Sequence, residues 1–207
     1  MGELAGEGMN SNKIILDLCG GTGSWSKPYK DAGYDVRVIT WPEDDCVLWP
    51  SKPYEGGRLP SQFKSIEEYP EVYGVLAAPV CTCFSGSGAC WPRTDSDMRE
   101  ALGLVSACIR IIWTLKPKFW AMENPVGKLR KWIGPPVFSF HPCDYGDPYK
   151  KKTLLWGEFN SNLVKNTVEP IIPSPLHQNY GGKSARTKEA RSITPQGFAQ
   201  AFFQANR

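Results

Sequence analysis

Short apolar runs recur along the chain, separated by stretches rich in Pro, Gly and charged residues. A run of four to eight apolar or β-branched residues between such turn-forming residues is typical of a buried β-strand. The runs lie at 13–18, 36–40, 72–78, 118–122, 137–141 and 153–159. The sequence therefore predicts six strands, and it predicts a loop at 42–61, where Pro, Gly and Asp are frequent.

Two longer stretches carry signals of α-helices. The first is predicted to begin with Asp95 or Ser96 as its cap and to end near residue 115. Its apolar side chains recur at helical spacing, at Leu102, Val105, Ile109 and Ile112. The second is predicted over 195–204, with Thr194 as N-cap and Pro195 at the first helical position.

The alternation of strands and helices, which includes a short helix predicted at 26–32, indicates an α/β fold with a mostly parallel sheet. A chain of 207 residues is long enough for one domain with a sizeable core, which we expect over 13–207. Residues 1–12 are polar and Gly-rich and predict a disordered extension. No apolar run is long enough to cross a membrane and no signal pattern is present, so we expect a cytoplasmic protein.

Cysteines and charges narrow the picture only slightly. Seven cysteines, an odd number spread along the chain, do not suggest a disulfide framework. The formal net charge of +3 is too small to indicate a nucleic-acid partner by itself. Basic residues nevertheless gather in the second half, at Lys128, Arg130, Lys131, Lys150, Lys151, Lys152, Lys183, Arg186, Lys188 and Arg191. On charge alone, solvated surface side chains are sufficient to explain them.

A glycine-rich turn, Asp17-Leu-Cys-Gly-Gly-Thr-Gly23, lies where the first strand ends and a helix is about to begin. Glycines there let the backbone approach a ligand closely, and amides at the helix start can bind a carboxylate or phosphate. The spacing lacks the third glycine of a dinucleotide fingerprint, so a plain tight turn is the alternative. After the second strand, Glu43 or Asp44 could bind ribose hydroxyls. Trp41 could stack on an adenine ring or pack in the core.

Cys81 follows the strand predicted at 72–78 and begins a loop rich in Gly and Ser. A polar loop at the end of a strand can hold a reactive thiolate. In an extended segment, Cys83 would face the same side as Cys81. An inert buried cysteine is one alternative, and zinc binding by Cys81, Cys83 and Cys90 is another. Zinc is disfavoured because these cysteines lack the paired spacing of structural sites and the chain has only two histidines.

The segment Glu123-Asn-Pro125 follows an apolar run that ends at Met122. A carboxyl group at the carboxyl end of a strand lies in the crevice where α/β sheets bind ligands. A helix cap or a simple turn is the alternative, because Asn-Pro often begins one. Its place after the glycine-rich turn and Cys81 favours the functional interpretation.

With these elements in this order, the chain resembles DNA (cytosine-5) methyltransferases, especially the short members encoded by phages and prophages. The resemblance covers most of residues 13–205. The glycine-rich turn resembles the S-adenosylmethionine loop of the family, and Ala78-Pro-Val-Cys-Thr-Cys-Phe-Ser85 resembles its catalytic Pro-Cys motif. Met122-Glu-Asn-Pro125 is similar to its Glu-Asn-Val motif. Residues 145–156 resemble the basic strand that contacts the flipped cytosine, and 191–198 resemble the closing motif.

This resemblance implies a Rossmann-like methyltransferase fold and methylation of cytosine C5 in DNA, in the host cytoplasm if a phage encodes the chain. It implies that the Cys81 thiolate adds to cytosine C6, that Glu123 binds ring N3, that Asn124 orients the site, and that Lys152 or Lys151 contacts the base. The residues implied in binding S-adenosylmethionine are Asp17, Cys19, Gly20, Gly21, Gly23, Trp41, Glu43 and Pro79. Those implied in binding DNA are Ser85, Gly86, Trp91, Arg93, Lys150 and Lys151, with 86–94 as a lid.

The chain departs from the family in several respects, including lysines in the basic strand where many members carry arginines. Val80 stands where the family has a proline before the cysteine. Only residues 158–191 separate the basic strand from the closing segment at 192–207, so there is little or no room for a target-recognition domain. We therefore expect short or relaxed sequence specificity, or a specificity partner. Alternatives are an RNA substrate, a larger or anionic derivative of the donor that extra lysines such as Lys150 would suit, and a non-catalytic DNA- or cofactor-binding regulator that kept the fold.

Overall fold

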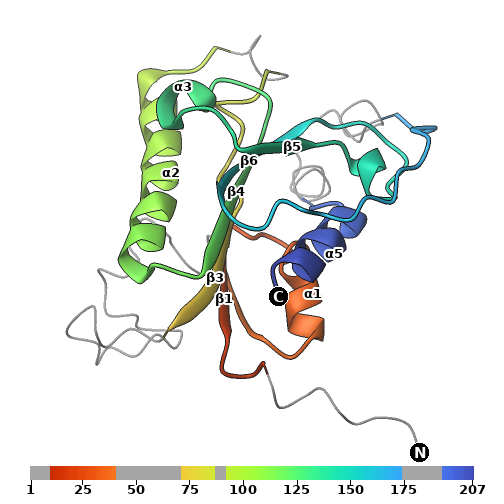
Figure 1. Cartoon of the computed structure of the whole chain (residues 1–207). Helices are drawn as coiled ribbons and strands as arrows, with labels where there is room; N and C mark the ends of the chain where they lie inside the picture. Colours follow the sequence, from red (N-terminus) through yellow and green to blue (C-terminus); the bar gives the residue numbers. More distant parts are fainter. Residues whose placement is uncertain (1–9, 41–70, 87–91, 174–192) are drawn as a thin grey trace, which may run out of the picture.

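The structure is a computed structural model that describes residues 10–40, 71–86, 92–173 and 193–207 (Figure 1). Its strands are β1 Ile14–Leu18, β2 Asp35–Ile39, β3 Val72–Ala77, β4 Phe119–Pro125, β5 Phe138–Phe140 and β6 Thr153–Glu158. Its helices are α1 Lys27–Asp31, α2 Asp95–Leu115, α3 Arg130–Ile133 and α5 Gln196–Ala205, with a 3-10 turn η3 at Pro142–Asp144. No helix in these described ranges is long and apolar enough to cross a bilayer.

The six strands form one sheet in the order β2-β1-β3-β4-β6-β5. The pairs β1–β2, β1–β3 and β3–β4 are parallel, and β6 is antiparallel to both β4 and β5. Only β6 therefore runs against the rest, which confirms the predicted α/β fold with a mostly parallel, Rossmann-like sheet. The strand order reverses between β1 and β3, and such a switch point is where open α/β sheets bind ligands, outside the carboxyl ends of the strands.

Helices cover both faces of the sheet: α2 lies on one face, and α1 and α5 lie on the other (Figure 1). Alternation along the strands sends Leu18, Ala77 and Met122 into the core on the α2 face. Leu76 and Ala121 point to the opposite face, into a second core rich in aromatic rings. The buried aromatic side chains of this second core are Trp25, Tyr29, Tyr34, Phe119, Phe140, Tyr145, Phe198, Phe202 and Phe203.

The N-cap of helix α2 lies one residue before the earlier of its two predicted positions. Thr94, not Asp95 or Ser96, is the N-cap: its hydroxyl accepts a bond from the Asp97 amide at 3.1 Å. Asp97 in turn accepts a bond from the Thr94 amide at 2.8 Å, which completes a capping box. The bond from the Thr94 amide, and a second one that the Thr94 hydroxyl donates to Asp97 Oδ2 at 2.9 Å, lower the pKa of Asp97. Because several hydroxyl and carboxyl residues adjoin one another here, sequence alone could not choose among them.

The closing helix α5, by contrast, begins one position later than predicted. Pro195 is its cap residue, and the Thr194 amide donates instead to the Ser24 hydroxyl at 2.8 Å, beside the glycine-rich turn. The helix buries Phe198 and Phe202 against Trp25, with ring centroids 6.0 and 5.5 Å apart. Residues that follow the first strand and residues near the chain's end are therefore packed together.

Strand β4 is longer than predicted, because Glu123, Asn124 and Pro125 pair with Leu155, Leu154 and Thr153 of β6. The alternative of an Asn-Pro turn is therefore wrong. The sequence did not predict α3 or η3. Residues 1–9 of the predicted extension and the loop predicted at 42–61 lie outside the described residues.

Candidate active site

The carboxyl ends of three adjacent parallel strands, β1, β3 and β4, bring together the segments that the sequence singled out. The glycine-rich turn follows β1, and the Cys81 loop follows β3. Glu123 lies near the end of β4, where β4 still pairs with β6. Backbone bonds hold these ends in register: the Ala78 amide donates to the Leu18 carbonyl at 2.9 Å, and the Cys19 amide donates to the Ile39 carbonyl at 2.7 Å. These segments therefore lie side by side at the switch point of the sheet, where α/β sheets bind ligands.

The glycine-rich turn is tightly wound. Cys19, Gly21 and Gly23 have φ angles of 58, 55 and 68°, and this left-handed region is uncommon for a residue with a side chain such as Cys19. At Gly20, an added Cβ would lie 2.4 Å from the carboxyl carbon of Asp17. The turn thus needs glycine both for its dihedral angles and for its close approach to a buried carboxylate.

Asp17 itself is fully buried beneath this turn. The Ser26 hydroxyl, also buried, donates to Asp17 Oδ2 at 2.5 Å. From the other side, the Gly21 amide donates to Thr40 Oγ1 at 2.8 Å. Ser26 and Thr40 were missed by the sequence interpretation, although a hydroxyl at the start of the next helix and another at the end of the next strand are available signals.

Cys81 is exposed, and the chain turns directly after it. The amides of Phe84 and Ser85 both donate to the Cys81 carbonyl, at 2.9 and 2.8 Å. The expectation that Cys81 and Cys83 lie in an extended segment is therefore wrong. The Cys83 thiol, partly buried, donates instead to the Asp97 carbonyl at 3.5 Å, so the two cysteines have different surroundings.

The Cys81 loop, residues 81–86, is fastened from two sides. Arg93 donates from its guanidinium to the Thr82 carbonyl at 3.2 Å. On the other side, the Gly86 amide donates to the Val126 carbonyl at 2.9 Å, and the Lys128 amide donates to the Phe84 carbonyl at 2.7 Å. The segment that follows β4 therefore holds the Cys81 loop in place.

Glu123 is partly buried in β4, opposite Leu155. Burial raises the pKa of the Glu123 carboxyl, and the nearby ammonium of Lys151 lowers it in part. The next residue, Asn124, is fully buried and donates from Nδ2 to the Pro79 carbonyl at 3.0 Å. A side chain at the end of β4 is thus bonded to the backbone just before Cys81.

The three lysines before β6 differ in their relation to Glu123. In the antiparallel β4–β6 pair, Glu123 shares a face with Leu155, and alternation carried back along the chain puts Lys151 on that face and Lys152 on the other. Lys151 is partly buried, whereas Lys150 and Lys152 are exposed. The resemblance implied Lys152 or Lys151 at the reacting base, and the charge that reaches Glu123 is that of Lys151.

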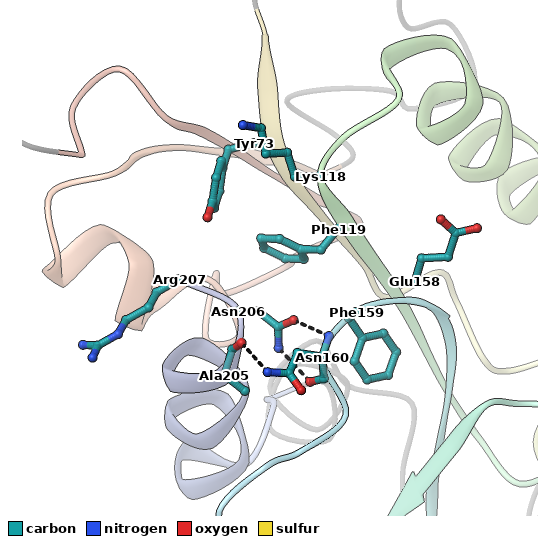
Figure 2. Close-up of a pocket in the computed structure, with 9 residues that line it drawn as sticks. All are labelled: Tyr73, Lys118, Phe119, Glu158, Phe159, Asn160, Ala205, Asn206 and Arg207. Carbon is teal, nitrogen blue, oxygen red and sulfur yellow. Dashed lines mark hydrogen bonds between the residues drawn. The ribbon is translucent and has the colours of Figure 1, made fainter.

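A surface hollow of about 360 Å³ lies at the opposite end of the sheet, beside Tyr73 near the start of β3 and Phe119 at the start of β4 (Figure 2). Its polar groups largely bind one another. The backbone amide of Asn160 donates to Asn206 Oδ1 at 2.8 Å, and Asn206 Nδ2 donates to the Phe202 carbonyl at 2.9 Å. These hydrogen bonds join the end of α5 to the segment after β6. We call Asn160 and Asn206, with their bonds, the clasp; the hollow lies beside it, away from the Cys81 end of the sheet.

The described residues place Cys81, Glu123, Asn124, Lys151 and the glycine-rich turn at one edge of the sheet. Ser85 and Gly86 lie in the Cys81 loop, and Arg93 is bonded to it. Trp41, Glu43 and Trp91, together with residues 87–91 of the expected lid, lie outside the described residues.

No family model matches the chain. The chain is 25% identical over 192 residues to the type II methyltransferase M.DdeI of Desulfomicrobium norvegicum, covering 78% of this chain and 44% of that protein. It is 29% identical over 121 residues to the type II methyltransferase M.FnuDI of Fusobacterium nucleatum, covering 56% of this chain and 33% of that protein. The chain thus spans less than half the length of these curated relatives.

Among solved structures, a crystal structure described as a DNA modification methyltransferase encoded within an E. coli prophage matches with a TM-score of 0.49 and 16% identity. The match covers 80% of this chain and 54% of the solved one.

Proposed function

We propose that this protein transfers a methyl group from S-adenosylmethionine to C5 of cytosine in DNA, through a covalent bond between Cys81 and the base. The observation that carries the proposal is that exposed Cys81 and partly buried Glu123 both lie at the carboxyl ends of the adjacent strands β3 and β4. The Asn124–Pro79 hydrogen bond ties the two segments together. Sequence similarity to two type II methyltransferases supports the class of reaction.

The glycine-rich turn fits the cofactor. Its left-handed residues and the absence of a Cβ at Gly20 leave backbone close to the switch point, where a ligand with ribose and carboxylate groups can approach amides. We assign cofactor binding to this turn, to Pro79 and to two residues outside the described ranges, Trp41 and Glu43. When bound, S-adenosylmethionine supplies an electrophilic methyl group to cytosine C5. Asp17, which is buried, holds the turn in shape from below.

Cytosine C5 is a poor nucleophile, and Cys81 overcomes this by adding as a thiolate to C6. A sulfur–carbon bond forms at C6, and the electron pair of the C5–C6 double bond moves toward C5. After C5 has gained the methyl group, water takes the C5 proton and the Cys81 sulfur leaves with its bonding pair. The exposure of Cys81 in a turn that Phe84 and Ser85 stabilise supports this role.

Glu123 donates a proton or hydrogen bond to ring N3 and so stabilises the charge that develops in the ring. Burial raises the pKa of this carboxyl, so it keeps its proton to a higher pH than an exposed glutamate does. Lys151 lies on the same face and is the better candidate than Lys152 to contact the base. Asn124 acts as a positioning residue through the Pro79 carbonyl.

DNA is the substrate on this proposal, and the target base must leave the helix stack to reach Cys81. We assign contacts to the DNA around the flipped base to Ser85 and Gly86 of the Cys81 loop, to Arg93, which is bonded to that loop, and to the exposed Lys150. Trp91, outside the described residues, is the remaining candidate. The short span at 158–191 favours a short or relaxed target sequence.

Mass spectrometry of nucleosides tests the proposal, using DNA from cells that express the wild type or Cys81→Ser. We expect 5-methylcytosine with the wild type and none with Cys81→Ser. Cys83→Ser is the matched control, because it changes a neighbouring thiol that is bonded to the Asp97 carbonyl, and it should keep the product. A heavier modified cytosine would overturn the donor. Unmodified cytosine in every sample would overturn the reaction.

A further inference from the structure

A strongly basic segment follows β4, and the chemistry above does not use it. From Asn124 to Cys143 the chain has no Asp or Glu, while Lys128, Arg130 and Lys131 lie close together within this stretch. We call residues 126–133, which contain these cations and α3, the basic strap. Its charge of +3 equals the formal net charge of the whole chain. Charge alone does not distinguish a binding segment from a solvated surface, so the place of these cations in the fold decides.

The basic strap is anchored from below and presents its charges outward. Leu129 is fully buried in the core under α2, and Ile133, four residues later, packs against the same core. Lys128, Arg130 and Lys131 are exposed, and Trp132 beside them is 57% exposed. Within the part of the chain that the structure describes, none of these three cations forms an ion pair. They are therefore available to an anionic partner.

The basic strap is also attached directly to the Cys81 loop. Ser85 and Gly127 form an antiparallel bridge, flanked by the bonds Gly86–Val126 and Lys128–Phe84. An added Cβ at Gly127 would lie 1.8 Å from the Phe84 carbonyl oxygen, so the two backbones are in the closest contact that glycine permits. The cations of the strap therefore lie on a segment that is bonded directly to the Cys81 loop.

We propose that the basic strap binds the phosphate backbone of DNA next to the base held at Cys81. Lys and Arg contacts to phosphates provide affinity and register but carry no base information. The strap would thus supply binding that a larger recognition domain supplies elsewhere, without adding sequence specificity. This inference rests on the proposed function and identifies a substrate contact that the motifs do not contain.

Salt-dependent DNA binding tests the strap. The parent protein carries Cys81→Ser, so that no covalent bond forms. The strap variant carries in addition Lys128→Gln, Arg130→Gln and Lys131→Gln. A matched control removes three exposed cations elsewhere, with Lys30→Gln, Lys118→Gln and Arg207→Gln. Lys118 and Arg207 line the hollow at the opposite end of the sheet. Affinity for a cytosine-containing duplex is measured by fluorescence anisotropy from 50 to 200 mM salt.

Each lost phosphate contact lowers the slope of log affinity against log salt by about 0.9 for B-DNA, so three contacts lower it by about 2.7. Across this fourfold salt range, the parent protein should lose about 40-fold more affinity than the strap variant. The control should keep the parental slope. Equal slopes for all three proteins would overturn the inference while leaving the proposed function intact. Unmodified cytosine in the nucleoside experiment would instead overturn the proposed function, whatever the strap binds.

Discussion

The two ends of the parallel sheet are built in opposite ways. At the carboxyl end, Cys19 has a left-handed backbone, Glu123 is a desolvated carboxyl with a raised pKa, and Cys81 exposes a thiol. At the amino end, aromatic rings interlock: Tyr29 lies 5.9 Å from Phe119 and 4.9 Å from Phe203, measured between ring centroids. One end keeps groups in unfavourable states, and the other fills its space with apolar contacts.

The two ends of the sheet also differ in how fully their buried polar atoms are hydrogen-bonded. Both the Nδ2 and Oδ1 atoms of Asn206 are hydrogen-bonded, and the Tyr29 hydroxyl donates to the Asn206 carbonyl at 3.2 Å. At the other end, buried Asn124 has a bond from Nδ2, but its Oδ1 atom has no partner among the described residues. Strained and desolvated groups persist only where the rest of the fold fixes them. The packed amino end of the sheet, the aromatic end, therefore stabilises a fold that holds Cys19 and Glu123 in unfavourable states at the carboxyl end, the reactive end.

Glu123→Gln should produce the largest effect of these substitutions, a loss of activity. Replacing a carboxylic acid at ring N3 removes general acid catalysis, which contributes about 10² to 10⁴-fold to a rate. We expect a loss of that size in the rate of cytosine modification, measured with purified protein and DNA in single turnovers. A loss below about threefold would remove Glu123 from the reaction.

Stability is the control for this change. The folded pKa of Glu123 lies above the ordinary value of 4.5, so the folded state holds the proton more firmly and loses stability as pH rises through that window. Gln does not titrate, so the stability difference in favour of Glu123→Gln should grow as pH rises above about 4.5. Denaturant unfolding at several pH values measures it. A variant that becomes relatively less stable over that range would contradict the assigned burial.

Phe202→Ala should produce the reverse pattern. Phe202 is fully buried and touches Trp25, Phe119 and Phe159, with ring centroids 5.3 to 6.1 Å apart. Truncating such a side chain costs about 3–5 kcal/mol of folding free energy. Chemical denaturation should show that loss, while the rate of modification per folded molecule stays within about twofold. A rate loss as large as that of Glu123→Gln would mean that the two ends of the sheet are not separable.

The pattern of apolar residues was sufficient to predict the fold, because each apolar run records burial on a sheet. All six strands lie where the pattern placed them, with ends shifted by a few residues. The errors occur where long-range pairing decides. Strand β4 continues through Pro125 only because β6 pairs with it from about 30 residues further along the chain. No local signal in Glu123-Asn-Pro125 reports that partner.

The candidate site divides in the same way. Cys81, Glu123 and the glycine-rich turn are local motifs, and sequence alone brought them forward. The contacts that connect them are not local: Thr40 bonds to Gly21, Asn124 bonds to Pro79, and Gly127 packs on Phe84. Each contact joins residues on different elements, so only the folded chain brings them together. The choice between Lys151 and Lys152 depends on the same β4–β6 register.

That choice gives the smallest expected effect, and it tests the register from which it comes. The Lys151 ammonium lowers the pKa of Glu123, so Lys151→Gln should raise it and move the alkaline limb of the rate profile to higher pH. The rate itself should fall by less than about tenfold, because Gln can still donate a neutral hydrogen bond to the base. Lys152→Gln, the neighbour whose side chain alternation places on the other face, should leave the limb in place. Rates of cytosine modification from pH 5 to 9 compare the two variants. If Lys152→Gln moves the limb and Lys151→Gln does not, Lys152 is the lysine that acts on Glu123, and the alternation of side chains does not extend from β6 back to residue 151.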